Sequence, residues 1–126
     1  MLSSNKVGAL VNDVIVNEVM NRVQEVEHNG ILMKFTVPNS LNRFRVESFS
    51  NKEPETLKWI DCFPDNAVLW DVGANVGLYS VYAAKKKNCN VIAFEPSVFN
   101  LELLALISHS GAFNVSVNMA PKPTLN

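Results

Sequence analysis

The sequence has few of the residues that bind metals or form disulfides, and it has no long apolar run. Its 126 residues include two cysteines and two histidines, and no further metal ligands cluster near Cys62 or Cys89. The sequence therefore predicts no metal site, and both cysteines are expected to be free thiols in or near a core. No apolar run approaches the roughly 20 residues of a membrane span, so no membrane partner is expected.

An excess of one charge is also lacking. Eleven Lys and Arg residues face twelve Asp and Glu residues, for a net charge of −1. This balance does not favour a nucleic acid or an anionic membrane surface as a partner. The first 20 residues mix polar and apolar side chains, unlike the core of a signal peptide, so a cytoplasmic location is expected. A hydrophobic content of 48% fits a globular chain of at most one domain.

Two patterns indicate an N-terminal extension over residues 1–40. Apolar residues recur at spacings of three and four between Val7 and Ile15, which predicts an amphipathic helix over about residues 4–20. A β-hairpin is predicted next. Apolar and polar residues alternate over 22–27, His28-Asn29-Gly30 supplies the turn, and residues 31–37 form the second strand.

Residues 41–126 are predicted to be the N-terminal part of an α/β domain. Residues 41–52 show no clear pattern, and Pro54 favours the first turn of a helix. The expected elements after that helix are a strand over 67–72, a helix from residue 78 to the three lysines at 85–87, a strand over 91–95, a helix over about 98–108 and a short strand over 114–117. The large aromatic residues are expected in the core: Trp59, Trp70, Phe94 and Phe99.

The most informative stretch is Asp71-Val72-Gly73-Ala74-Asn75-Val76-Gly77-Leu78, at a predicted strand-to-helix turn. Gly73 and Gly77 let the backbone turn sharply and approach a ligand without a Cβ. The Asp71 carboxylate at the strand edge can receive a cationic or hydrogen-bond-donating group. Glu95 ends the next strand, where a carboxylate can hold the two ribose hydroxyls of a nucleoside. This layout is typical of a site for a nucleotide-like cofactor.

The spacing of the glycines argues against a dinucleotide. The pyrophosphate fingerprint starting at Gly73 needs glycines where Asn75 and Leu78 stand. An acid before the turn would repel a pyrophosphate, whereas it suits a ligand with an ammonium group and no phosphate, such as S-adenosylmethionine. A nicotinamide-dependent oxidoreductase is the weaker alternative. Each of these residues also has a purely structural alternative. The two glycines could form a turn that binds no ligand, Asp71 could cap the following helix, and Glu95 could be an exposed acid in a turn.

Residues 33–104 resemble the FkbM family of S-adenosylmethionine-dependent methyltransferases. The matching stretches are Phe35-Thr36-Val37-Pro38-Asn39, Lys52-Glu53-Pro54-Glu55-Thr56-Leu57, Trp59-Ile60, Leu69-Trp70-Asp71-Val72-Gly73-Ala74-Asn75-Val76-Gly77-Leu78-Tyr79-Ser80, Ala93-Phe94-Glu95-Pro96 and Asn100-Leu101. The resemblance implies a Rossmann-like class I methyltransferase sheet and methyl transfer to a hydroxyl of a sugar or polyketide-type acceptor. It further implies that Asp71, Gly73 and Gly77 line the methionine part of the cofactor and that Glu95 binds the ribose. Asn75 belongs to the same motif.

The chain is shorter than a full domain of this family and ends near the third strand. We therefore expect an incomplete sheet, with only the first two or three parallel strands and their helices. The alternative to an active methyltransferase is a truncated, inactive remnant or a subunit that a partner chain completes. An open sheet edge with bare apolar surface favours self-association or such a partner. The sequence does not identify a general base.

Overall fold

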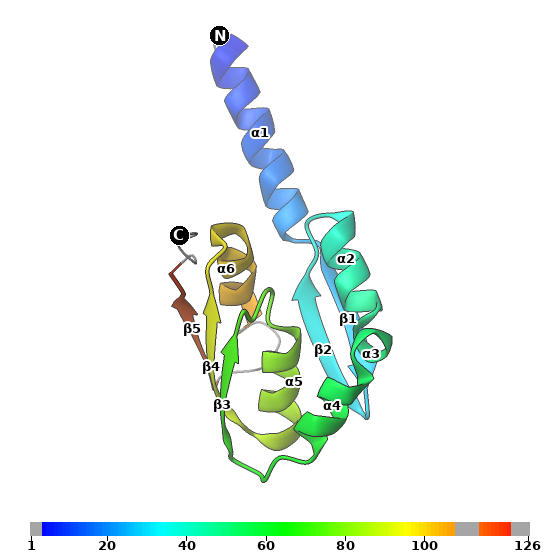
Figure 1. The fold of residues 1–126 in the computed structure, drawn as a ribbon. Helices are drawn as coiled ribbons and strands as arrows, with labels where there is room; N and C mark the ends of the chain where they lie inside the picture. Colours follow the sequence, from blue (N-terminus) through cyan, green and yellow to red (C-terminus); the bar gives the residue numbers. More distant parts are fainter. Residues whose placement is uncertain (1–3, 108–113, 122–126) are drawn as a thin grey trace, which may run out of the picture.

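The computed structural model describes residues 4–107 and 114–121. A helix and a hairpin come first, then three helices, and then strands that alternate with helices (Figure 1). The elements are α1 (Ser4–Met20), β1 (Val23–His28), β2 (Ile31–Thr36), α2 (Ser40–Glu47), α3 (Phe49–Lys52), α4 (Pro54–Asp61), β3 (Val68–Val72), α5 (Leu78–Lys87), β4 (Asn90–Glu95), α6 (Val98–Ala105) and β5 (Val115–Met119).

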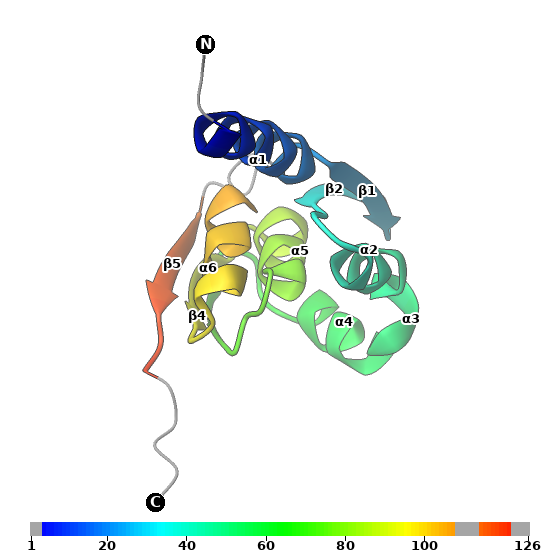
Figure 2. The ribbon, with the colours of Figure 1, turned by 90° about the horizontal axis from the view of Figure 1, so that it is seen from above.

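A parallel three-stranded sheet and the antiparallel hairpin enclose helix α5. The order of the sheet is β3-β4-β5, and Leu69, Val91 and Val115 stand side by side across it. Helix α5 contacts β3 and β4 on one side and β2 on the other, so it lies between the two β layers (Figure 2). Because the three strands are parallel, their carboxyl ends meet at one edge of the sheet, where open α/β sheets bind ligands.

The central position of α5 explains its composition. All five residues from Ser80 to Ala84 are buried, whereas a surface helix buries only one stripe. The helix ends in three lysines, whose charge suits the negative end of the helix dipole. Asn88 closes it in the left-handed conformation with a φ of 51°. The predicted helix from residue 78 to the lysines is therefore confirmed.

The turn of the hairpin is held against α4 and α5. Asn29 and Gly30 have φ angles of 48° and 80°, as the predicted tight turn requires. The Asn29 Nδ2 donates to Asp61 Oδ2 at 3.0 Å, and the Tyr82 hydroxyl donates to Asp61 Oδ1 at 2.6 Å. The His28 ring lies 5.4 Å from the Tyr82 ring in an edge-on arrangement. These contacts fix the register of the hairpin relative to the body.

Helix α1 has the predicted bounds but packs against little. None of its residues is buried, and it extends away from the rest of the chain (Figure 1). Its apolar stripe is exposed at Val7, Leu10, Val11, Val14 and Ile15. Among the described residues, no helix is both long enough and apolar enough to cross a membrane.

Helices α2 and α3 occupy the stretch 41–52, for which the sequence pattern predicted no element. Asn39 caps α2, since its Oδ1 accepts a hydrogen bond from the Asn42 N–H at 3.0 Å. Val46 and Phe49 are buried and anchor the two helices to the core. Both helices are short, which explains why periodicity did not predict them.

The predicted helix at Pro54 and all three predicted parallel strands are confirmed within a residue or two at each end. The third of these is β5, which follows a stretch outside the described residues. Helix α6 ends at Ala105 rather than near residue 108. Residue 108 itself lies outside the described residues.

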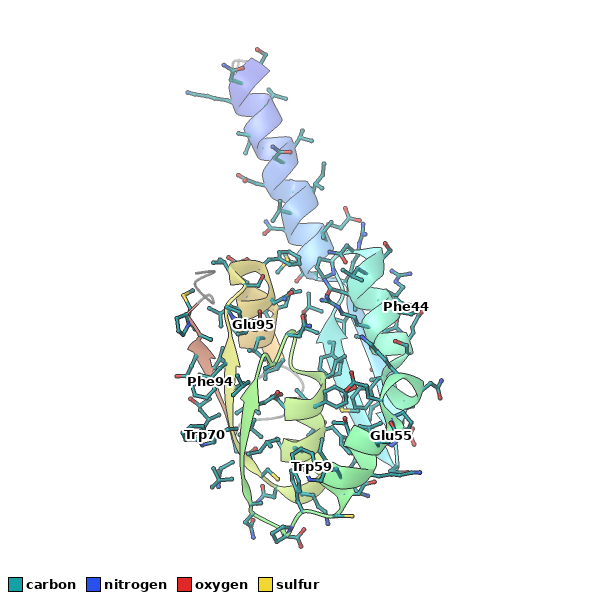
Figure 3. The ribbon with its side chains drawn as sticks, in the orientation of Figure 1. Phe44, Glu55, Trp59, Trp70, Phe94 and Glu95 are labelled. Atoms are coloured by element: carbon teal, nitrogen blue, oxygen red, sulfur yellow. The ribbon has the colours of Figure 1, made fainter. Side chains whose placement is uncertain are left out.

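One face of the sheet carries no helix among the described residues. Burial alternates along β3: Leu69 and Asp71 face α5, whereas Val68, Trp70 and Val72 are exposed on the opposite face. Ile92 and Phe94 of β4 stand beside Trp70 and Val72 in the register. In Figure 3 Trp70 and Phe94 lie on the side turned away from α5. We call Val68, Trp70, Val72, Ile92 and Phe94 the bare sheet face.

The expectation that the large aromatic residues form the core is therefore wrong for three of the four. Trp70 is 67% exposed on the bare sheet face, Trp59 is 58% exposed on α4, and Phe99 is exposed on α6. Phe94 is only partly buried. β3 pairs with β4 alone, so its other edge also has no partner strand in the described part of the chain.

Candidate functional site

Residues 73–77, the glycine loop, connect β3 to α5 at the carboxyl edge of the sheet. Gly73, Asn75 and Gly77 have positive φ angles of 78°, 57° and 88°, a backbone conformation that glycine and asparagine adopt most readily. The N–H groups of Gly73 and Ala74 both donate to the Phe94 carbonyl, at 2.8 and 2.9 Å. The end of β4 therefore fixes the start of the loop.

Two further amides of the loop, those of Asn75 and Gly77, also donate to acceptors within the protein. The Asn75 N–H donates to Glu95 Oε2 at 2.7 Å, and the Gly77 N–H donates to the Ala74 carbonyl at 2.9 Å. A loop that binds phosphate directs several free N–H groups at the anion. Because four amides of this loop already have acceptors, the geometry agrees with the interpretation that the site does not bind a pyrophosphate.

Glu95 is a buried acid at the end of β4 (Figure 3). Its side chain is 5% exposed, and besides Asn75 it accepts a hydrogen bond from the Ser97 N–H at 2.9 Å. The alternative of an exposed turn acid is therefore wrong. An ionised carboxylate has about four lone-pair positions, so roughly two remain for another donor.

Asp71 is half-buried at the end of β3. Its Oδ2 accepts a hydrogen bond at 2.5 Å from the hydroxyl of Ser80, which is buried in α5. Burial raises the pKa of Asp71 above its ordinary value; the Ser80 hydrogen bond opposes this effect, and the nearby negative charge of Glu95 adds to it. An acid that lies in such surroundings gains from a cationic partner.

A cavity of about 260 Å³ opens beside these residues. Its wall on the sheet side comes from β3, the glycine loop and the first turn of α5. The helical wall comes from α2, from α3 and from the residue that follows α3. The lining residues are Arg45, Phe49, Lys52, Glu53, Asp71, Gly73, Ala74, Asn75, Val76, Leu78 and Tyr79.

The structure brings three of the five predicted site residues to this cavity: Asp71, Gly73 and Asn75. Glu95 lies directly behind the loop and contacts it through the Asn75 amide. Gly77 is buried, and a Cβ on it would stand 2.6 Å from Leu104 Cδ1. The structure therefore gives Gly77 a packing role between α5 and α6, and cofactor binding by all five residues stays a prediction.

Four polar lining residues were not predicted from the sequence: Arg45, Lys52, Glu53 and Tyr79. Arg45 and Lys52 lie in the stretch to which no element was assigned, although the cap at Asn39 signals a helix there. Burial and the adjacent Glu53 carboxylate raise the pKa of Tyr79 to about 12. Tyr79 is therefore neutral at physiological pH, and its hydroxyl is hydrogen-bonded to Glu53.

No family model matches the sequence, and no curated protein matches it. Solved structures do match. The M. jannaschii TYW2 structure in complex with AdoMet has a TM-score of 0.55 and 19% identity, over 79% of this chain and 43% of that chain. The Pyrococcus abyssi tRNA (uracil-54, C5)-methyltransferase, in complex with S-adenosyl-L-homocysteine, has a TM-score of 0.54 and 18% identity. The match covers 80% of this chain and 24% of that chain.

The N-terminal domain of EvdMO1, determined with SAH and D-fucose present, has a TM-score of 0.51 and 17% identity, over 87% of this chain and 44% of that chain. The chain thus spans less than half the length of these structures. At these identities the likeness concerns the fold. The fold is an incomplete Rossmann-like methyltransferase fold, with a three-stranded parallel sheet, an N-terminal helix and a hairpin.

Proposed function

We propose that this chain is part of an S-adenosylmethionine-dependent methyltransferase. One observation carries the proposal: Asp71 and Glu95 stand at the carboxyl ends of adjacent parallel strands, beside a loop in which four amides donate to acceptors within the protein. This arrangement offers negative charge and acceptors instead of a phosphate cradle. Similar structures hold AdoMet or S-adenosylhomocysteine, which supports the choice of ligand.

The residues present fit such a ligand. Asp71 lines the cavity, and its carboxylate would receive the ammonium group. Glu95 would accept from the ribose hydroxyls through the lone pairs that Asn75 and Ser97 leave free. The bound cofactor supplies a methyl group on a positively charged sulfur. The contribution of the chain is alignment of that group with an acceptor oxygen, and none of its residues is assigned as the base.

The acceptor that we propose is a hydroxyl of a sugar or of a polyketide-type molecule, as the resemblance to the FkbM family implies. The presence of D-fucose with the EvdMO1 domain supports a sugar. Transfer of labelled methyl groups to a panel of free sugars and glycosides tests this choice. Labelling of an amine or a nucleic acid, with no labelling of hydroxyl acceptors, would contradict it.

Calorimetric titration with S-adenosylhomocysteine tests the binding claim. Asp71→Asn and Glu95→Gln each remove one charge with little change of shape, and we expect about tenfold weaker binding because each hydrogen bond involves a charged group. Glu102→Gln is the matched control, because Glu102 is exposed on α6 and does not line the cavity. Folded wild-type protein that gives no heat at millimolar ligand would remove the proposal.

A second proposal concerns whether this chain forms the whole methyltransferase sheet. The chain transfers methyl groups only when further strands extend the sheet at β3, and by itself it is an inactive remnant or a subunit. The unpaired edge of β3 and the bare sheet face favour this proposal. The added strands could belong to a partner or to another part of the same protein. Size-exclusion chromatography tests it, since a compact monomer with cooperative unfolding and methyl-transfer activity would contradict it.

A further inference from the structure

The cavity beside the glycine loop is lined by residues of both charge signs. Asp71 lies on the strand wall, and Arg45 and Lys52 lie on the helical wall that α2 and α3 form. Glu53 also lines the cavity, so two cations and two acids surround one space of about 260 Å³. This balance of charge matches a ligand that is itself a zwitterion.

The two cations are available to a ligand. Among the described residues, the salt bridges join Lys34 to Glu25 and Lys87 to Asp65, and neither involves a cation of the cavity. The Arg45 Nη1 donates one hydrogen bond at 3.3 Å to Asn42 Oδ1. A guanidinium has five N–H donors, so most of them remain for another acceptor.

Lys52 is more accessible than Arg45. Its ammonium group has no hydrogen-bond or ion-pair partner among residues 4–107 and 114–121. Arg45 is half-buried, whereas Lys52 is exposed. A half-buried guanidinium is the stronger anchor, because water screens its charge less and its planar fork pairs with a carboxylate through two parallel bonds.

We infer that Arg45 and Lys52 bind the carboxylate of the methionine part of the cofactor, while Asp71 receives its ammonium group. The inference rests on the proposed function and extends it to residues outside the glycine motif. It makes the helical wall, and not the strand edge alone, a determinant of cofactor binding. The N-terminal helices α2 and α3 therefore hold one end of the ligand.

S-adenosylmethionine and its decarboxylated form test this inference, because they differ only by the carboxylate. Calorimetry on the wild-type chain should give tighter binding of the carboxylated form, by about thirtyfold. Arg45→Met should weaken it about tenfold and Lys52→Met about threefold, whereas neither change should affect the decarboxylated form beyond about twofold. Arg45→Lys keeps the charge but loses the planar fork, so it should recover only part of the loss.

Arg43→Met and Lys58→Met are the matched controls, since each removes one exposed cation from α2 or α4 outside the cavity lining. They should leave both affinities unchanged. Equal loss for both ligands in Arg45→Met, or no loss for either, would overturn the inference while leaving the proposed function in place. Unchanged cofactor binding with a raised KM for an acidic acceptor would assign the cations to the acceptor and also overturn it. A wild-type chain that binds neither ligand would overturn the proposed function itself, and this inference with it.

Discussion

Gly73 and Gly77 share a left-handed backbone conformation but have different surroundings. A Cβ at Gly73 would meet nothing within 4 Å, so only the backbone conformation requires glycine there. At Gly77 a Cβ would also collide with Leu104, a fully buried side chain of α6. The pair that reads as one motif in the sequence therefore has two roles: one glycine borders the cavity, and the other lets two helices approach.

The difference predicts unequal costs for the same substitution. Gly73→Ala should lower the free energy of unfolding by about 1 kcal/mol, the usual cost of a strained φ. Gly77→Ala should lower it by about 3 kcal/mol, because overpacking against Leu104 adds to that strain. Urea unfolding of both variants measures the two values. Equal losses would contradict a packing role for Gly77.

The two tyrosines of the chain provide a pH test. Burial raises the pKa of Tyr79 to about 12, with Glu53 adding its charge, and burial with the Asp61 hydrogen bond raises that of Tyr82 to about 12. Both folded pKa values exceed the unfolded value of about 10, so the unfolded chain loses its protons first. The stabilisation is complete below about pH 10 and is lost as the pH rises towards 12.

The ultraviolet absorbance of tyrosinate measures the ionisation of the two tyrosines directly. At about pH 11 the folded chain should be roughly one tenth ionised, against roughly nine tenths in denaturant. Asp61→Asn should lower the apparent pKa of Tyr82, and that of Tyr79 should stay unchanged. Ordinary titration near pH 10 in the folded chain would contradict the packing of both rings.

At the scale of the element, the sequence predicts the strands and helices that carry a strong local signal. The short apolar runs over 67–70 and 91–94 predict β3 and β4, and the glycine loop with the lysine run predicts α5 between them. Alternation over 22–27 and the turn at Asn29 predict the hairpin. Helices α2 and α3 escape prediction because each has one or two buried residues, too few to show a period. The sequence accordingly predicts only one part of the candidate site. The residues of its strand wall follow from the glycine motif. The helical wall, with Arg45 and Lys52, could not be predicted, because tertiary folding brings it to the cavity.

Helix α1 is well signalled in the sequence, yet it buries nothing. Its removal, by deletion of residues 1–20, should change the free energy of unfolding by less than about 0.5 kcal/mol, as for surface changes in general. Met33→Ala is the positive control, because Met33 is fully buried in β2 and its truncation should cost about 3 kcal/mol. Chemical denaturation followed by tryptophan fluorescence measures both. A large loss on removal of α1 would show that the helix packs on the body.

In the whole molecule, the described elements that cover the sheet all lie on one side of it. The hairpin and the helices α4, α5 and α6 lie on the side of the sheet that faces the core (Figure 2). Local sequence could not reveal this, because an apolar strand residue such as Trp70 looks the same whether or not a helix covers it. The expectation of a core role for Trp70 is wrong for this reason, because no helix among the described residues covers the face on which it stands.

The two tryptophans provide a matched test of the bare sheet face. Both are exposed, but they lie on different surfaces. Trp70 stands on that face with its ring 5.9 Å from the Phe94 ring, whereas Trp59 stands on α4 with its ring 4.6 Å from that of Phe63, which follows the helix. If the sheet face drives association, wild-type protein should show concentration-dependent oligomers in sedimentation velocity. Trp70→Lys should shift these towards monomer, since a buried unpaired charge costs several kcal/mol, and Trp59→Lys should not. The same shift in both variants, or a wild-type chain that is monomeric at all concentrations, would show that the bare sheet face tolerates water without a partner.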